Sequence, residues 1–164
     1  MSAHAYEPLD KYLNAYGDMV YRVAFSYTKN KMDAEDVAQD VFMKLLSAHP
    51  SFENAAHEKA WLLRVTINFS KNRLKSFWHT KTGALSDTLP YQDCPNEDSG
   101  VLQAVLSLPA MQRLAVYLFY YEGYSTAEIA PLIQKKESTV RSLLHRARAA
   151  LKEQLKEDYD NALL

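Results

Sequence analysis

Polar side chains recur at helical spacing in the first half of the chain, and their types suit the binding of an anionic polymer. These residues, in steps of four, three and four, are Arg64, Asn68, Lys71 and Lys75. At about 100° of rotation per residue, they form a single stripe along one helix. Basic groups in such a stripe attract phosphate. We therefore expect a nucleic-acid contact here, and the alternative interpretation is a solvated helix face.

A second basic segment lies between Lys135 and Lys152, where six Lys and Arg residues accompany the single acid Glu137. Helical spacing places small or moderate side chains opposite its apolar stripe, and such a surface fits the major groove of DNA. Basic groups would contact phosphates, and the candidates for reading bases are Arg141, Ser142 and His145. A solvated helix face is again the alternative. The residues expected to bind DNA here are Lys135, Lys136, Ser138, Thr139, Arg141, Ser142, His145, Arg146 and Arg148.

Residues with catalytic or metal-binding chemistry do not combine into a site. Ser26 and Lys29 match a bare Ser-x-x-Lys pattern that lacks a partner motif. The five histidines have no metal-ligand spacing, and the single cysteine, Cys94, excludes an internal disulfide framework and a cysteine-based zinc cluster. The four glycines cannot form a glycine-rich phosphate loop. We therefore expect no catalytic residue, no metal and no cofactor.

Helices must position these side chains. The 164 residues suffice for one ordinary domain or two small ones. Helical periodicity on both sides of a proline- and acid-rich stretch predicts an all-α protein with two small helical domains. The expected boundaries are residues 1–82 for the first domain, 83–100 for a linker and 101–164 for the second domain. The linker core, residues 86–100, contains four acids and no Lys or Arg, which favours flexible or extended backbone.

Three helices are predicted in the first domain. Asp18 is expected to cap a helix that runs to about Thr28. A second helix is expected to open at Asp33, with Asp36 in the position of a capping-box acid. Its outward polar side would carry Asp36, Gln39, Asp40 and Met43. A third helix is expected over residues 58–78, with an apolar side that consists of Trp61, Leu62, Val65 and Phe69.

A helix-turn-helix is predicted in the second domain. After a helix over about residues 109–123, Ser125 and Glu128 form a capping box that must start a short helix. A polar turn at residues 134–137 follows, and a second helix is expected from Ser138. Helix, four-residue turn and helix are the parts of a helix-turn-helix.

The distribution of charge matters more than its sum. The formal net charge of −1, from 19 Lys and Arg against 20 Asp and Glu, excludes a uniformly basic surface. However, residues 59–81 contain six basic residues and no acid, and the Lys135–Lys152 segment is similarly basic. The balancing acids lie in the linker, in the second helix and near the chain ends. Two basic surfaces with an acidic connector are typical of a nucleic-acid reader with two modules.

Three motifs in this order resemble extracytoplasmic-function (ECF, group IV) bacterial sigma factors of the sigma-70 family. The first is Asp33-Ala-Glu-Asp-Val-Ala-Gln-Asp-Val-Phe-Met-Lys-Leu-Leu46, and the second is Lys59-Ala-Trp-Leu-Leu-Arg-Val-Thr-Ile-Asn68. The third comprises Tyr124-Ser-Thr-Ala-Glu-Ile-Ala130 and Ser138-Thr-Val-Arg-Ser-Leu-Leu-His-Arg-Ala-Arg148. The ordered set spans about residues 10–156 and is more specific than a helix-turn-helix alone.

The resemblance implies a dissociable promoter-specificity subunit of RNA polymerase that acts in a stress or envelope response and is not an enzyme. In the family, a region 2-like domain docks its second helix on a coiled coil of the largest polymerase subunit. This implies core-polymerase binding by Asp36, Gln39, Asp40 and Met43. The solvated helix face remains the alternative for these four residues.

The resemblance also implies two DNA contacts. The third helix of the family recognises the melted minus-ten element, and the matching positions are Arg64, Asn68, Lys71, Asn72 and Lys75. Phe77 and Trp78 would either stack on exposed bases or pack the end of the helix. The region 4-like helix-turn-helix would read the minus-thirty-five element and touch the polymerase flap, while the linker would thread toward the catalytic cleft.

The chain departs from the family pattern at several positions. Gln134 and Lys135 stand where a glycine and an apolar residue are often found, so a non-glycine residue would take a left-handed conformation. Pro131 would remove one backbone hydrogen bond and kink the first helix of the motif. Leu143 and Asn72 stand where Arg and Asp are frequent. These departures bear on the promoter contacts and not on the fold.

Two other functions remain as alternatives. A sigma-like decoy would sequester an anti-sigma factor and has no use for the two basic stripes, whereas a stand-alone helix-turn-helix regulator leaves the first domain without a task. The partners expected are core RNA polymerase, promoter DNA and a cognate anti-sigma factor. The first residues lack the pattern of a signal peptide, and no apolar run of about 18 residues could cross a membrane. We therefore expect a cytoplasmic protein without membrane insertion.

Overall fold

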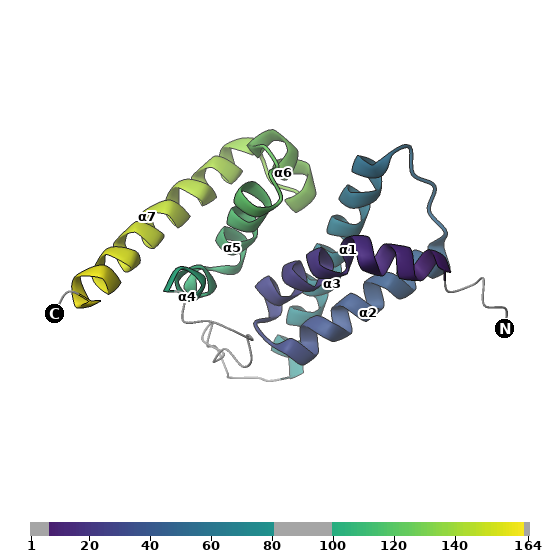
Figure 1. Ribbon diagram of the computed structural model, residues 1–164, viewed down its shortest axis with the longest axis horizontal. Coiled ribbons are helices and arrows are strands. Elements are labelled where there is room, and N and C mark those ends of the chain that lie inside the picture. Colours follow the sequence, from purple (N-terminus) through teal and green to yellow (C-terminus); the bar gives the residue numbers. More distant parts are fainter. Residues whose placement is uncertain (1–6, 81–99, 163–164) are drawn as a thin grey trace. The chain divides into compact units, whose positions relative to one another are not determined.

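The computed structural model describes residues 7–80 and 100–162, and every regular element in these ranges is a helix. The chain divides into two compact units, of which the first contains α1 to α3 and the second contains α4 to α7 (Figure 1). This confirms the all-α class with two small helical domains. The linker predicted at residues 83–100 lies, except for Gly100, outside the described residues, and so do the side chains of Phe77 and Trp78.

Three helices form the first unit, namely α1 (Glu7–Thr28), α2 (Lys31–Ala48) and α3 (Ala55–Thr80). Each helix packs against the other two (Figure 1). Apolar side chains that recur every three or four residues place one stripe of each helix in a shared core. The fully buried members of this core include Val20, Val23, Ala24, Val37, Val41, Leu62, Leu63 and Ile67.

The start of α1 differs from the prediction. The helix already includes Glu7, so Asp18 is an exposed residue inside the helix and not its cap. Leu9 and Leu13 continue the apolar spacing upstream of the predicted start, which explains the longer helix. Gly17 does not interrupt it, because a glycine in a helix interior costs only about 1 kcal/mol relative to alanine.

The predicted cap of α2 is also wrong. The helix begins at Lys31, and the N-cap is Asn30, whose Oδ1 accepts a hydrogen bond from the backbone N–H of Asp33 at 3.1 Å. Asp33 therefore lies in the first turn, where a carboxylate is favoured by the helix dipole. Asp36 lies beyond that turn and is not a capping-box acid.

The buried side of α3 includes two polar residues that the prediction left out. Of the predicted apolar side, only Leu62 is buried, and Trp61, Val65 and Phe69 are half-buried. Thr66 and Ser70 are fully buried, and their hydroxyls donate to the carbonyl oxygens of Leu62 and Thr66 at 2.6 and 2.7 Å. Because these bonds satisfy both hydroxyls within the helix, the two residues can face the core beside Leu63 and Ile67. The helix also begins at Ala55, earlier than predicted.

The second unit contains α4 (Gly100–Ser107), α5 (Ala110–Val116), a π-helical turn η2 (Tyr117–Tyr121), α6 (Thr126–Ile133) and α7 (Glu137–Ala162). Helices α4, α5 and α6 all pack against α7 (Figure 1). The core includes Leu114, Leu118, Ile129, Ile133 and Leu144. The short helix α4 lies outside the predicted helices, because its eight residues follow directly on the acid-rich stretch that predicts a linker.

The helix-turn-helix begins as predicted. The backbone N–H of Glu128 donates to Ser125 Oγ at 3.1 Å, and the backbone N–H of Ser125 donates to Glu128 Oε1 at 3.2 Å. This reciprocal pair is a capping box, and it fixes the first residue of α6. Helix α7 begins at Glu137, next to the predicted Ser138.

The turn after α6 contains a strained residue. Gln134 adopts φ 56° and ψ 45°, as the sequence predicted for a left-handed position without glycine. The backbone N–H of Lys135 donates to the carbonyl of Ala130 at 3.0 Å, which is the long bond of a Schellman motif. Pro131 lies inside α6, and the helix ends soon after it at Ile133. The predicted kink at Pro131 stays a prediction.

Candidate functional site

Helix α2 presents one side to solvent. Its Asp36, Gln39, Asp40 and Met43 are all exposed, and Met43 is 60% exposed. Their separations of three, four and seven residues from Asp36 place them on one helix face. Met43 also lines a contiguous apolar groove, and exposed apolar surface of that kind marks a site that binds a partner. We call these four residues, for which the sequence predicts core-polymerase binding, the docking face.

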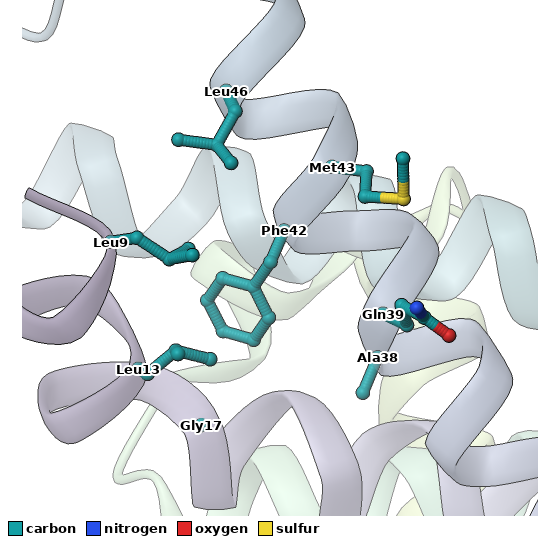
Figure 2. Close-up of a pocket in the computed structure, with 8 residues that line it drawn as sticks. All are labelled: Leu9, Leu13, Gly17, Ala38, Gln39, Phe42, Met43 and Leu46. Carbon is teal, nitrogen blue, oxygen red and sulfur yellow. The ribbon is translucent and has the colours of Figure 1, made fainter. Parts of the chain in front are cut away.

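An apolar groove lies beside the docking face, between α1 and α2 (Figure 2). Its volume is about 430 Å³, and two of the residues that line it, Gln39 and Met43, belong to the docking face itself. The remaining lining residues are Leu9, Leu13, Gly17, Ala38, Phe42 and Leu46. Sequence reasoning missed the α1 side of this groove, although the spacing of Leu9 and Leu13 was a signal for it.

Arg73 of α3 connects the docking face to the rest of the first unit. Its Nη2 donates to Asp33 Oδ1 at 2.7 Å and to Asp36 Oδ2 at 2.8 Å, and its Nε donates to Asp33 Oδ1 at 3.2 Å. The hydrogen bond with Asp33, and then the negative charges of both carboxylates, raise the pKa of the Arg73 guanidinium. The Arg73 side chain therefore binds α2, although the residue belongs to the basic segment of residues 59–81.

The basic stripe on α3 lies on the opposite side of that helix from Arg73. Arg64 and Arg73 are nine residues apart, which corresponds to about 180° of helical rotation. The stripe therefore faces away from α2 and its carboxylates. Arg64, Asn68, Asn72 and Lys75 are exposed and Lys71 is half-exposed, so the predicted residues lie together on an accessible surface.

The predicted DNA-binding residues of the helix-turn-helix lie on the outer side of α7 and in the turn before it. All of them are exposed except Thr139, which is half-buried. Arg141 Nη1 lies 3.9 Å from Glu137 Oε1, and both side chains are well exposed, so this ion pair is weak. Glu137 also accepts a hydrogen bond from Thr126 Oγ1 at 2.9 Å, which joins the starts of α6 and α7.

Arg148 differs from the other basic residues of α7. Its Nε donates to the Tyr120 hydroxyl at 2.6 Å, and its guanidinium carbon lies 5.5 Å from the ring centre of Phe119 and 5.6 Å from that of Tyr120. These are cation–π distances. Arg148 thus packs on η2 at one flank of α7. Sequence reasoning missed this contact, because Phe119 and Tyr120 lie in a segment interpreted only as the end of a helix.

Metal-binding and membrane-spanning features are absent from residues 7–80 and 100–162. No group of three or more His, Cys, Asp or Glu side chains in these ranges could hold a metal ion. No helix in the described part of the chain is long and apolar enough to span a membrane.

Both units match the sigma-70 family. Residues 13–80 match the model of Sigma-70 region 2, and residues 100–151 match that of Sigma-70, region 4. The ECF RNA polymerase sigma factor SigE of Mycolicibacterium smegmatis is 34% identical over 158 residues, covering 89% of this chain. SigM of Mycobacterium tuberculosis, also an ECF RNA polymerase sigma factor, is 30% identical over 145 residues, covering 87% of this chain.

The chain spans 61% of the length of SigE and 74% of the length of SigM. A similar solved structure is that of the sigma factor RpoE in complex with the anti-sigma factor NepR from Bartonella quintana. That structure is 25% identical, with a TM-score of 0.75 over 92% of this chain and 98% of that one. The two domain matches in this order, together with these relatives, show that the chain belongs to the extracytoplasmic-function group of the sigma-70 family.

Proposed function

We propose that this protein binds core RNA polymerase and directs promoter-specific initiation of transcription in a stress or envelope response. One observation carries the proposal: the first unit presents an acidic, partly apolar docking face on α2 and a basic stripe on the side of α3 that faces away from α2. Two such surfaces suit two partners of opposite charge, a basic protein surface and DNA, bound at the same time.

We assign a task to each part of the chain. Residues 1–82 would bind core polymerase and the melted minus-ten element, residues 101–164 would bind the minus-thirty-five element through the helix-turn-helix, and residues 83–100 would connect them. The protein would contribute binding, and polymerase would supply the bond-making chemistry. This assignment places the protein in the cytoplasm, where polymerase acts.

A cognate anti-sigma factor is a further proposed partner. The similar RpoE of Bartonella quintana is bound to the anti-sigma factor NepR in its solved structure. An exposed docking face with an adjacent apolar groove is a surface that such an inhibitor would cover to keep polymerase away. Pull-down of the protein from the native cell, followed by mass spectrometry, would identify this partner.

Run-off transcription tests the main proposal. The purified protein, free of inhibitor, is combined with core polymerase and a library of promoter fragments, and specific transcripts are expected only when both proteins are present. The absence of any specific transcript would overturn the proposal.

A decoy that only sequesters an anti-sigma factor is tested by charge reversal. Arg141→Glu with Arg146→Glu is expected to abolish specific transcripts, whereas Lys156→Glu, an exposed charge elsewhere on α7, serves as the control. If the reversed variant retained full function in the cell, the decoy would be favoured instead.

A further inference from the structure

A single guanidinium group bridges two carboxylates on successive turns of α2. Arg73 reaches both Asp33 and Asp36 with its Nη2, at 2.7 and 2.8 Å. The Asp33 backbone is held at the start of α2, because its N–H donates to Asn30 Oδ1 at 3.1 Å, and its carboxylate accepts from both Nε and Nη2 of Arg73. The network therefore has one rigid end, at the start of α2, and one end on the docking face.

Arg73 is not part of the basic stripe on α3. It lies about 180° around the helix from Arg64, and its donors point to α2. Its side chain is 39% exposed, less than the 52% of Asp36. The charge of Arg73 is thus used within the first unit, and of its two carboxylate partners only Asp36 belongs to the docking face.

We propose that Arg73 is a positioning residue for polymerase docking: it holds the Asp36 carboxylate in one orientation, with Oδ2 engaged and Oδ1 left for the partner. The proposal rests on the proposed function, since it assumes that the docking face binds core polymerase. The half-exposed Asp36 side chain remains reachable from solvent while Oδ2 is bonded to Arg73.

Prior ordering of Asp36 favours binding for two physical reasons. A side chain that is already fixed loses little conformational entropy when its partner arrives. The guanidinium also lies between two carboxylates three residues apart on one helix, where like charges would otherwise repel. Both effects keep the Asp36 carboxylate directed in one orientation, which favours a charge-assisted hydrogen bond from a basic side chain of the partner.

A double-mutant cycle on core-polymerase affinity tests the proposal. Arg73→Met and Asp36→Asn are each expected to weaken binding about three- to tenfold, and the double variant is expected to bind no more weakly than Asp36→Asn alone. Asp33→Asn releases the fixed end of the network, so it is expected to weaken binding although Asp33 is not on the docking face. Thermal unfolding by circular dichroism is measured for each variant, and the midpoints are expected to stay close to that of the natural protein.

The control and the contradicting outcomes separate this proposal from the function on which it rests. Lys31→Met removes an exposed positive charge from the first turn of α2 and is expected to leave core affinity unchanged. If the natural protein failed to bind core polymerase, the proposed function would be wrong. If the natural protein bound and Arg73→Met bound equally well, or if the two substitutions were additive, the positioning role alone would be overturned.

Discussion

Each unit diverts one arginine of its basic segment to a contact within the unit, but the partners differ. In the first unit, Arg73 bonds to the carboxylates of Asp33 and Asp36. In the second unit, Arg148 bonds to the Tyr120 hydroxyl and packs on aromatic rings. Carboxylates cancel the charge of Arg73, whereas aromatic rings leave the charge of Arg148 in place. A count of basic residues in a segment therefore overstates the positive charge that is left for a further partner, and the contacts within the unit decide how much charge each arginine still presents.

The largest effect is expected from charge reversal in the basic stripe of α3, which lies on the opposite side of that helix from Arg73. Arg64→Glu with Lys71→Glu reverses two charges on the proposed minus-ten surface, and we expect promoter opening to fall by about 100-fold or more. Core-polymerase binding is expected to remain, because the stripe faces away from α2. Permanganate footprinting of the melted region and a core-binding titration measure the two properties.

The control for this variant is Lys11→Glu with Lys31→Glu, which places the same charge change on exposed positions outside the stripe. Loss of core binding by the stripe variant would show that its residues belong to the docking surface, and the separation between the two sides of α3 would then be wrong.

A smaller effect is expected on the docking side of the first unit. Met43→Asp places a carboxylate at the edge of the apolar groove, and we expect core affinity to fall by about tenfold, because a charge must then be buried in an interface. Met32→Asp is the matched control, since Met32 lies on the same helix and is 74% exposed outside the groove. Equal affinities of the two variants for core polymerase, measured by fluorescence anisotropy, would argue against the groove as part of the docking surface.

The comparison of arginines predicts different salt dependences on α7. With holoenzyme and a duplex minus-thirty-five fragment, Arg146→Met is expected to reduce the slope of log affinity against log salt by about 1. Arg148→Met is expected to reduce the slope by clearly less than Arg146→Met does, and to lower the free energy of unfolding by about 1 kcal/mol through the lost hydrogen bond and cation–π contacts. An equal reduction of the slope by the two variants would mean that the Arg148 guanidinium leaves Tyr120 to bind phosphate.

The smallest effects are expected on the stability of the second unit, which holds Arg148 and the other basic residues of α7 in place. They are tested by substitutions at the two ends of α6. Gln134→Gly is expected to stabilise the protein by about 0.5 kcal/mol, because relief of the left-handed strain exceeds the entropy that glycine adds to the unfolded chain. Ser125→Ala is expected to destabilise it by about 1 kcal/mol through loss of the cap. Urea unfolding of both variants measures the changes, and destabilisation by Gln134→Gly would contradict the assigned strain.

Local chemistry made most of the fold predictable, and long-range contacts made part of the site unpredictable. Ser125 and Glu128 are three residues apart, so their capping box can be recognised in the sequence and is confirmed in the structure. The two diverted arginines find partners 40, 37 and 28 residues away in the sequence, which no local pattern indicates. Buried Thr66 and Ser70 were missed for a different reason: a polar residue that satisfies its hydroxyl within its own helix can join a core that apolar spacing alone does not outline.

Gly17, which lines the groove, makes it possible to fill the proposed docking surface by a substitution within the protein. The groove has a volume of about 430 Å³, so a bulky side chain placed in it would compete with a partner that docks there. A side chain added at Gly17 would meet nothing within 4 Å of its Cβ, which leaves room to fill the groove from inside the protein. Gly17→Leu would therefore occupy the groove from within and is expected to weaken the binding of the partner without a change of charge.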